Sequence, residues 1–507
     1  MHLLRVLRQN QLNKIASIRC LCDGKSNKET DNVIDPFTEN RVNPVLRTGR
    51  VLKKDFVDAK HFFLPKRLDN GDIDIRDLRS RANDNEFQSH CDVLIIGGGG
   101  VGASIAYWLK KRGGHGLNVV VIEKDPTYKS ASTTLSVGGL RQQFSLEENI
   151  QMSLYAADFM REIKEHLDDD VELNFTPHGY LMLATEAGAE TLTENSQLQN
   201  KMGAKNELLT ANQLKNKFPW LNTDGIALGC HGLEKEGWFD PWALLMGFKR
   251  TASRLGAHFV HGEAISFELE KDQNIQVVGV EPGTYEAVHK VFVKLESGEV
   301  RPIKFSQVII AAGAQSGNVA KLAKIGTSTG MRSMALPVEP RKRYVYVFES
   351  QGLNCPGLNT PLTIDPSHVY FRRDGIGGNY IGGRSPDPEN EPSTDNLDVD
   401  YGYFDNEVWP RLAARVPAFE SIKVKSAWAG FYEYNKFDEN GIIGPHPYYN
   451  NLFFATGFSG HGIQQTPAIG RAVSEMILDG DFRTIDLTRL CFDRILVDQP
   501  MYETNCV

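Results

Sequence analysis

The sequence predicts an α/β fold, α+β overall, and two patterns support this. Between residues 91 and 124 a buried-strand pattern, a glycine-rich turn, a helical pattern and a second buried strand follow one another. The segments RYVYVF (343–348) and HVYFRR (368–373) are rich in β-forming residues and lack a helical period. Because 507 residues exceed one ordinary domain, we expect two intertwined lobes or two domains.

Charge and composition narrow the classes of partner. The formal net charge is −8 and no basic stripe follows the first residues, which argues against nucleic acid as the main partner. No apolar run approaches the roughly 18 to 20 residues that a transmembrane helix needs. The seven cysteines have neither CxxC nor zinc-ligand spacing, so we expect no metal site.

The first 25 residues have the composition of a mitochondrial transit peptide. The segment MHLLRVLRQNQLNKIASIRCLC carries four Lys or Arg residues and no acid, and its leucines can share one helical face. The alternative is a disordered basic tail. Residues 26–89 are polar and heavily charged, and we interpret them as an N-terminal extension that carries no visible chemistry.

The first chemical motif is a dinucleotide-binding turn. After the strand pattern Val93 to Ile96, Gly97, Gly99 and Gly102 follow at G-x-G-x-x-G spacing, and a helical pattern begins. The first glycine permits a tight turn, the second lets backbone approach a pyrophosphate, and the third lets the helix pack on the strand. The N-terminus of the helix offers N–H groups and a positive dipole to the phosphates.

The strand NVVVIEK, which follows, ends in an acid that suits the ribose of a dinucleotide. Glu123 comes 21 residues after Gly102 and can accept hydrogen bonds from the ribose diol. Its charge would repel a 2′-phosphate, which makes NADP a poor ligand. The motif alone does not separate NAD from FAD, because both contain an ADP half.

Three later features favour FAD. The segment YKSASTTLSVGGL, with Ser132 and Thr133, is small and rich in hydroxyl groups, as suits a chain beside a pyrophosphate and a flavin ring. The strand VIIAAGAQS ends in small residues, including Ala312 and Gly313. The run NLFFATGFSGHGIQQTPAIG predicts a strand, a glycine loop and a helix with Thr466 as its N-cap and Pro467 at its first position. A helix N-terminus aimed at the flavin would stabilise the negative charge of the reduced ring.

Together these segments resemble the D-amino-acid oxidase-like flavoproteins, the superfamily of sarcosine oxidase, glycine oxidase and dimethylglycine dehydrogenase. The marks are IIGGGGVGASIAYWL, VIEK, GWFDPWALLMGFKRTASRLGA, VIIAAGAQS and ATGFSGHG, and the resemblance covers about residues 90 to 490. It implies a Rossmann-like FAD-binding lobe interleaved with a substrate lobe built on an antiparallel sheet. The implied FAD lobe takes residues 90–175, 236–333 and 426–485, the substrate lobe takes 176–235 and 334–425, and 486–507 is a C-terminal tail.

The resemblance also extends the set of cofactor-binding residues, for example to Ala264, whose backbone would hydrogen-bond the adenine. The predicted set is Gly97, Gly99, Gly102, Glu123, Lys124, Ser132, Thr133, Ala264, Ala312, Gly313, Gly457, Gly460, His461, Gly462 and Ile463. Some relatives attach FAD covalently through a His or a Cys. At the matching positions this chain has Ser136 and Gly430 or a neighbour, neither of which can form the link. We therefore expect non-covalent FAD.

Two departures from the family bear on the reaction. Sarcosine oxidases have a Lys that promotes reaction of the reduced flavin with oxygen, and Tyr380 stands there. They have another Lys that helps hold the substrate carboxylate, and Gln464 stands there. The first change predicts a dehydrogenase rather than an oxidase. The second change removes a positive charge that would neutralise the carboxylate of the substrate.

The candidate catalytic residues are Arg372 and Tyr432. Arg372 precedes an Asp-Gly turn, where glycine oxidases have a substrate-binding Arg; the alternative is a surface Arg beside a hairpin. Tyr432 is a candidate to line the face of the flavin, although an aromatic residue next to a glycine commonly serves packing. We expect His461 to orient backbone or contact the flavin rather than to act as a base.

Two hypotheses for function remain open. The first is an FAD-dependent enzyme that takes hydride from the carbon next to nitrogen in a small amine or amino acid. The second is an FAD-binding assembly factor or scaffold with little turnover. Three segments resemble one mitochondrial member of the family nearly word for word, which implies a matrix protein associated with assembly of respiratory complex I. An NAD-dependent dehydrogenase would leave the C-terminal glycine loop unexplained.

Overall fold

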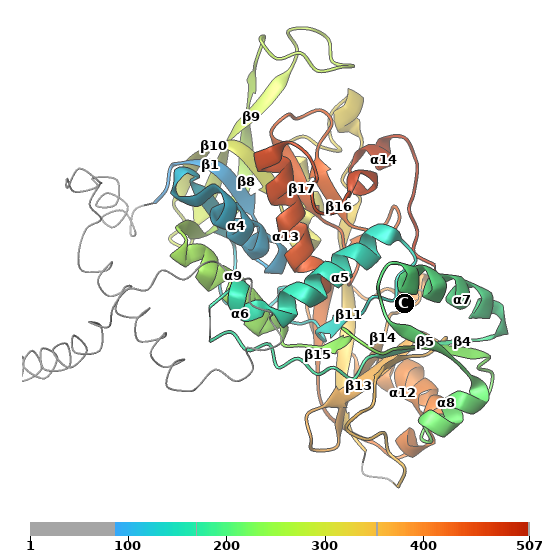
Figure 1. The fold of residues 1–507 in the computed structure, drawn as a ribbon. Coiled ribbons are helices and arrows are strands. Elements are labelled where there is room, and N and C mark those ends of the chain that lie inside the picture. The colour runs from blue at the N-terminus through green and yellow to red at the C-terminus, as the bar shows by residue number, and fades with distance from the viewer. Residues whose placement is uncertain (1–86, 169, 351–352, 505–507) are drawn as a thin grey trace, which may run out of the picture. The chain divides into compact units, whose positions relative to one another are not determined.

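Figure 1 shows the fold in a computed structural model, which describes residues 87–504 except 169 and 351–352. The predicted transit peptide (1–25) and nearly all of the predicted extension (26–89) lie outside the described residues. Within the described part, the fold consists of two large sheets with helices packed on them.

The first sheet has seven strands and contains the nucleotide-binding motif. Its order is β1-β2-β8-β9-β10-β17-β16, and β1 also pairs with β10. The strands are β1 (His90–Ile96), β2 (Val119–Glu123), β8 (Ala257–Lys271), β9 (Glu286–Leu295), β10 (Val300–Ile310), β16 (Ile442–Pro445) and β17 (Leu452–Thr456). The pairings β1–β2, β1–β10, β2–β8 and β10–β17 are parallel. Their uninterrupted apolar runs suit such strands, because both faces of a parallel sheet are covered.

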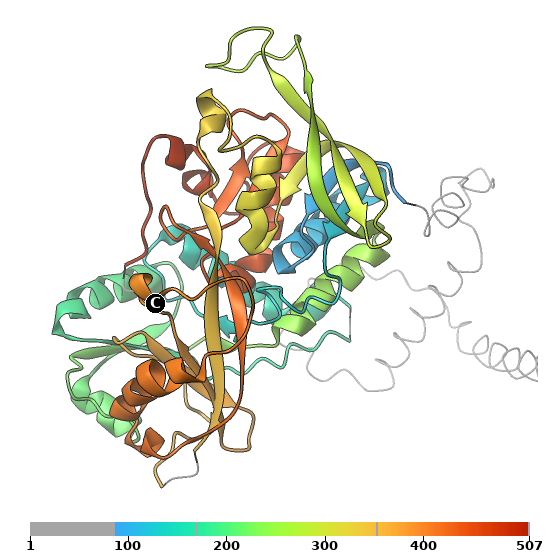
Figure 2. The same cartoon turned by 180° about the vertical axis from the view of Figure 1, so that it is seen from behind.

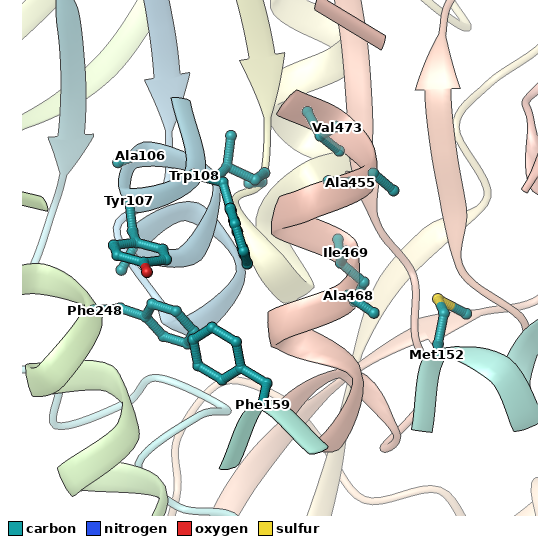
Figure 3. Packing of buried hydrophobic residues seen from close by; sticks show 14 of the residues in the cluster. Ala106, Tyr107, Trp108, Met152, Phe159, Phe248, Ala455, Ala468, Ile469 and Val473 are labelled. Atoms are coloured by element: carbon teal, nitrogen blue, oxygen red, sulfur yellow. The ribbon is translucent and has the colours of Figure 1, made fainter. Parts of the chain in front are cut away.

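Four helices share one core with this sheet (Figure 3). They are α4 (Gly100–Gly113), α5 (Glu147–Arg161), α9 (Pro241–Arg254) and α13 (Gly462–Asp479). The Phe159 ring of α5 stacks on Phe248 of α9 and lies 5.9 Å from the ring of Trp108 of α4. Helices α4 and α13 approach very closely, since a Cβ on Gly470 would lie 2.2 Å from Ser104 Oγ. This contact holds the early and late glycine loops in one body.

The predicted start of the last helix is wrong. Helix α13 begins at Gly462, directly after the N-cap residue His461, and Pro467 lies inside it. Because proline has no N–H, the sequence pattern favoured a start at Pro467. The helix ends at Asp479, and Gly480 follows the last turn in the left-handed conformation. The earlier start brings the free N–H groups of the first turn to the glycine loop itself.

The second sheet has eight strands in the order β15-β11-β14-β13-β12-β4-β6-β5. They are β4 (Tyr180–Ala184), β5 (Asn206–Thr210), β6 (Leu228–Gly232), β11 (Val338–Glu349), β12 (Leu362–Ile364), β13 (Val369–Asp374), β14 (Asn379–Arg384) and β15 (Lys423–Asn435). All pairs are antiparallel except β12–β4, which confirms the predicted antiparallel sheet. Strand β15 belongs to this sheet, so the expected lobe boundary at 426 falls inside a strand. The long strands β11 and β15, yellow and orange in Figure 2, lead toward the first sheet.

The described chain contains further β-strands and α-helices besides those of the two sheets and the core. They are β3 (Gly139–Leu140), α6 (Ile163–His166), α7 (Glu186–Lys201), α8 (Ala211–Lys217), β7 (Gly237–Trp238), α10 (Ser316–Leu322), α11 (Tyr401–Tyr403), α12 (Trp409–Arg415) and α14 (Asp493–Leu496). None of the helices between residues 87 and 504 is long and apolar enough to cross a membrane.

The predicted C-terminal tail is, in its described part, packed against the fold. Arg494 of α14 forms a buried ion pair with Asp438, 2.7 Å between Nε and Oδ2. The backbone N–H of Ser145 donates to the Glu503 carboxylate at 2.5 Å, and so does Asn149 Nδ2. These contacts fix the segment that precedes α5, which carries part of the candidate site.

Candidate active site

The glycines of the dinucleotide-binding turn are required by close contacts. Gly97 has φ +106°, and a Cβ there would lie 2.2 Å from the carbonyl oxygen of Ala311. A Cβ on Gly102 would lie 1.9 Å from the carbonyl oxygen of Gly97. A Cβ on Gly99 would meet only Thr133 Oγ1, at the ordinary contact distance of 3.5 Å. The turn leads into the N-terminus of α4, where Val101 and Thr133 line a cavity that can hold a ligand.

Glu123 lies under this turn. Its Oε2 accepts from the N–H of Gly98 at 2.7 Å, and its Oε1 accepts from the N–H of Asp125 at 2.8 Å. Burial raises the pKa of Glu123, and the two backbone donors oppose this effect. Each carboxylate oxygen has a second lone pair, so ribose hydroxyl groups can still donate to it.

Lys124 and Ala264 lie apart from the turn. Lys124 has a side chain that is 71% exposed and pairs with Glu263 at 2.7 Å. Ala264 lies in the part of β8 that pairs with β9, opposite Val293. Their roles in cofactor binding remain predictions.

A cavity lies between the second sheet and the N-terminal ends of α4 and α13. Its empty volume is about 870 Å³, a figure that includes the part open to solvent. Predicted site residues that line it are Ser132, Thr133, Tyr432, Gly460, Gly462 and Ile463. The cavity runs from the N-terminus of α4 past the N-terminus of α13 to β11 and β15. Two helix N-termini facing one cavity suit a long anionic ligand such as a flavin dinucleotide.

Ser136 and Gly430, which by the sequence resemblance stand at or beside the positions where some relatives attach FAD, both line this cavity. Ser136 lies on one side, and its Oγ accepts from the N–H of Gly138 at 3.1 Å. Gly430 lies on β15, and a Cβ there would be 3.0 Å from the Cβ of Leu135. Neither position offers an imidazole or a thiol to the cavity.

Tyr432 connects the glycine loop to the second sheet. A Cβ on Gly460, which has φ +92°, would lie 2.7 Å from the Tyr432 ring, so this ring packs directly on the loop. The guanidinium of Arg343 lies 5.2 Å from the centre of the same ring. The ring of Tyr432 therefore forms part of the cavity wall and also packs against the glycine loop at Gly460.

Arg372 is buried but is not among the residues that line the cavity. Its Nε donates to the carbonyl of Val137 at 3.1 Å, and its Nη1 donates to the carbonyl of Arg373 at 2.8 Å. Burial lowers the pKa of Arg372, and Asp374, 3.6 Å away, opposes this. Two of the three guanidinium nitrogens of Arg372 thus donate to backbone carbonyls. The role of Arg372 as a substrate anchor remains a prediction.

Sequence reasoning missed a second arginine, Arg141. Arg141 is 4% exposed and, like Arg372, is not among the residues that line the cavity. It forms no ion pair within the described part of the chain, and its Nε has no hydrogen-bond partner there. Its Nη2 lies 3.1 Å from His461 Nε2, and its guanidinium lies 4.8 Å from the centre of the Phe144 ring. The only feature of the sequence that could have indicated Arg141 is that one basic residue follows the glycine pair in the segment SVGGLR.

His461 faces Arg141 through one ring nitrogen. Because an arginine side chain can only donate hydrogen bonds, His461 Nε2 is the acceptor in this contact. His461 also meets the edge of Phe144 at 5.2 Å between ring centres. These contacts give it an orienting role toward Arg141.

The chain segment that carries Arg141 is held by a buried acid, Glu236. Its carboxylate accepts from the N–H of Gln142 at 2.7 Å and from Gln143 Nε2 at 2.9 Å. Burial raises the pKa of Glu236 to about 7. The ring of Tyr180 lies 6.0 Å from the Arg141 guanidinium, and its hydroxyl occupies the space of a Cβ on Gly139.

The two departures from the family have structural roles here. Gln464 Oε1 accepts from the N–H of Arg141 at 2.8 Å, so this neutral amide positions the arginine. Tyr380 is fully buried in the core of the second sheet, and its hydroxyl donates to the carbonyl of Pro356 at 2.7 Å. It does not line the cavity.

Comparison with known proteins identifies the cofactor of the family to which this chain is similar. The sequence profile of the family "FAD dependent oxidoreductase" (DAO) matches residues 92–476. The chain is 52% identical to the FAD-dependent oxidoreductase domain-containing protein 1 homolog of Drosophila melanogaster, over 92% of this chain and 93% of that protein. It is 50% identical to the Bos taurus FAD-dependent oxidoreductase domain-containing protein 1, over 82% and 87%.

Similar solved structures agree with the fold. The L-proline dehydrogenase of P. horikoshii has a TM-score of 0.67 at 25% identity, over 82% of this chain and all of that one. The glycine oxidase of Geobacillus kaustophilus has a TM-score of 0.63 at 21% identity, over 80% and 98%. The predicted fold class and the predicted FAD cofactor are both confirmed. The chain therefore belongs to the FAD dependent oxidoreductase family, DAO.

Proposed function

We propose that this protein is an FAD-dependent dehydrogenase that oxidises the carbon–nitrogen bond of a small amino acid or N-methylated amino acid. Arg141 carries the proposal. A buried guanidinium that forms no direct ion pair is costly even with the buried acid Glu236 close enough to attract it, and a substrate carboxylate would supply a direct partner through two charge-assisted hydrogen bonds. Similar proteins include the Rhizobium meliloti sarcosine oxidase subunit beta and the Bacillus subtilis glycine oxidase, whose names indicate small amino-acid substrates.

The residues of the chain bind and orient the substrate in this proposal. Bound FAD supplies the acceptor for the hydrogen and two electrons that leave the carbon next to nitrogen. Arg141 holds the carboxylate, and His461 fixes the direction of the guanidinium through its Nε2. The rings of Phe144 and Tyr180 cover the guanidinium and exclude water from it. A substrate that enters as the neutral amine leaves as an imine without a strong base, and water then hydrolyses the imine.

An anaerobic screen with matched pairs tests the proposal. FAD-loaded protein is mixed with sarcosine or proline and, separately, with dimethylamine or pyrrolidine, which lack only the carboxylate. The amino acids should bleach the flavin absorbance and the carboxylate-free amines should not. Equal bleaching by both members of a pair would exclude a carboxylate anchor. If dithionite bleaches the flavin and a wide set of amines and amino acids does not, the enzymatic proposal fails.

The proposed electron acceptor is not oxygen. The support is Tyr380, which is buried away from the cavity at the position where sarcosine oxidases carry a lysine. Reduced protein should therefore reoxidise slowly in air and rapidly with an artificial quinone or dye acceptor, as followed by the return of flavin absorbance. Rapid reoxidation in air would favour an oxidase.

We further propose a place in the mitochondrial matrix and a role in assembly of respiratory complex I. The support is the basic, acid-free N-terminal composition and the sequence resemblance to a mitochondrial member of the family. Cell fractionation tests the location, and the level of assembled complex I in cells lacking the protein tests the role. If Arg141→Gln restores complex I as well as the wild type does, a scaffold without turnover explains the role better than an enzyme.

A further inference from the structure

Glu433 is a carboxyl group that the proposed oxidation does not use, and it lines the FAD cavity. It lies on β15 beside Tyr432. Its Oε1 is 3.0 Å from the place of a Cβ on Gly462, and its Oε2 is 4.0 Å from the same point on Gly313. The carboxyl group therefore stands where the end of β10, the loop after β17 and the N-terminus of α13 converge.

Only neutral groups donate hydrogen bonds to this carboxyl. Thr456 Oγ1 lies 3.1 Å from Oε2, and the N–H of Gly457 lies 3.3 Å from it. The backbone of Phe458 contributes a further hydrogen bond. Among the residues that the structure describes, no Lys, Arg or His forms an ion pair with Glu433.

Titratable groups on the neighbouring elements are engaged with other partners. On β11, Arg343 pairs with Glu391 at 2.8 Å, and Arg341 pairs with the same carboxylate at 3.3 Å. At the start of α13, His461 faces Arg141. On β15 itself, the neighbours are Tyr432 and Tyr434, whose rings lie against these two arginines. Glu433 thus lacks a counter-ion from every element around it.

Burial without a counter-ion disfavours the charged form of an acid. It raises the pKa of Glu433 to about 7, and the hydrogen bonds from Gly457 and Thr456 oppose the effect. Near neutral pH, both the protonated and the ionised forms are therefore populated before any change in the charge of the cofactor.

We propose that Glu433 takes up one proton from solvent when the FAD held in this cavity is reduced, and releases it on reoxidation. Reduction brings negative charge into the cavity, and negative charge raises the proton affinity of a neighbouring carboxylate. The electrons come from the reductant, the proton comes from water, and the only bond formed at Glu433 is O–H. The inference rests on bound FAD and not on the substrate.

The test counts protons per two electrons in FAD-loaded protein. The flavin is titrated with a chemical reductant and redox dyes between about pH 6 and pH 8, and the slope of midpoint potential against pH gives the number of protons bound. Near pH 7, where part of the Glu433 population is already protonated, the wild type should bind a fraction of one proton more than Glu433→Gln, and the difference should approach one proton toward pH 8. The matched control is Glu391→Gln, which removes an ion-paired carboxylate near the same cavity and should keep the wild-type slope. Equal slopes in wild type and Glu433→Gln, or equal losses in both variants, would overturn the proposal.

A measurement on the wild type alone covers the case in which Glu433→Gln loses FAD. The infrared difference spectrum between reduced and oxidised protein should gain a band of a protonated carboxylic acid, and the band should shift in D₂O. A spectrum without that gain near pH 7 contradicts the proposal. Both measurements use a chemical reductant, so a failed substrate screen would leave this inference standing.

Discussion

At Gly102, the addition of a single methyl group should disrupt the nucleotide-binding turn. A Cβ there would lie 1.9 Å from the carbonyl oxygen of Gly97, which is backbone and cannot move aside. Gly102→Ala should therefore cost about 1–3 kcal/mol of folding free energy and push α4 away from β1. The flavin-to-protein absorbance ratio and the melting temperature should both fall. Gly116→Ala is the control, since nothing lies within 4 Å of that Cβ position.

Arg141 and Arg372 are competing anchors for a substrate carboxylate. Arg141→Gln should raise the substrate concentration for half-maximal flavin bleaching on the order of 100-fold, because a hydrogen bond to a charged group contributes about 1.5–3 kcal/mol. Arg372→Gln should have a smaller effect, since backbone carbonyls bind its Nε and Nη1. Both variants should retain FAD. A larger effect at Arg372 would reverse the assignment.

FAD should be bound without a covalent link. Ser136 and Gly430 line the cavity, and neither side chain can form a covalent bond to the flavin. The sequence resemblance places them at or beside the positions where some relatives attach FAD. After acid denaturation and centrifugation, the yellow flavin should remain in the supernatant. Flavin absorbance that sediments with the protein would show an attachment at another residue.

The tight glycine turn at Gly97 and Gly102 was predictable from the sequence, and the buried position of Arg141 was not. Gly97 and Gly102 act through local backbone geometry, which a short spacing motif records. Arg141 gains its meaning from residues distant in the chain, such as Tyr180 and His461. These long-range contacts cannot be inferred from a single sequence. Nothing in the sequence therefore distinguished Arg141 from an exposed arginine.

At the scale of elements, α13 shows how a local signal misleads. Thr466 and Pro467 form a good helix start, yet α13 begins at Gly462. The close packing of Gly470 on Ser104 of α4 and the hydrogen bond from Trp108 Nε1 to the carbonyl of Pro467 stabilise the longer helix. Tertiary contacts thus outweigh the missing N–H of one proline.

Helix α14 should be essential for stability although it has only four residues. Arg494 makes a two-point contact with Asp438, and both side chains are buried. Arg494→Met should cost about 3–5 kcal/mol of unfolding free energy, because it leaves a buried carboxylate unpaired. Chemical denaturation measures the loss, and adding Asp438→Asn should recover part of it. Arg483→Met, which breaks an exposed pair with Asp481, should change stability by less than about 1 kcal/mol.

At the scale of the whole molecule, the cavity exists because segments far apart in sequence meet. Its wall combines residues 132–137 after the first nucleotide-binding unit, β11 and β15 of the second sheet, and the start of α13. The architecture was predictable from the family resemblance. The place of β15 in the second sheet was not, because its alternation of residue types does not specify which sheet it joins.

The pH dependence of folding provides a test of the buried acid that supports Arg141. Burial raises the pKa of Glu236 from 4.5 to about 7, so the folded state holds a proton that the unfolded chain has already released. The stabilising contribution of this proton is complete below about pH 4.5, and it is lost as the pH rises to about 7. Wild type should therefore lose up to about 3 kcal/mol relative to Glu236→Gln over that window.

Chemical denaturation of FAD-loaded wild type and Glu236→Gln, at pH 5 and pH 8, measures this difference. The carboxamide imitates the protonated acid, and the Gln143 amide can turn to meet it. Glu475→Gln is the control: burial raises the pKa of Glu475, but hydrogen bonds from Thr484 and Arg471 outweigh it and leave the pKa below its usual value. That carboxylate is ionised at both pH values in both states, so its loss should cost the same at each. An unchanged difference between wild type and Glu236→Gln would mean that Glu236 is ionised throughout, and that the segment carrying Arg141 is held by a permanent negative charge.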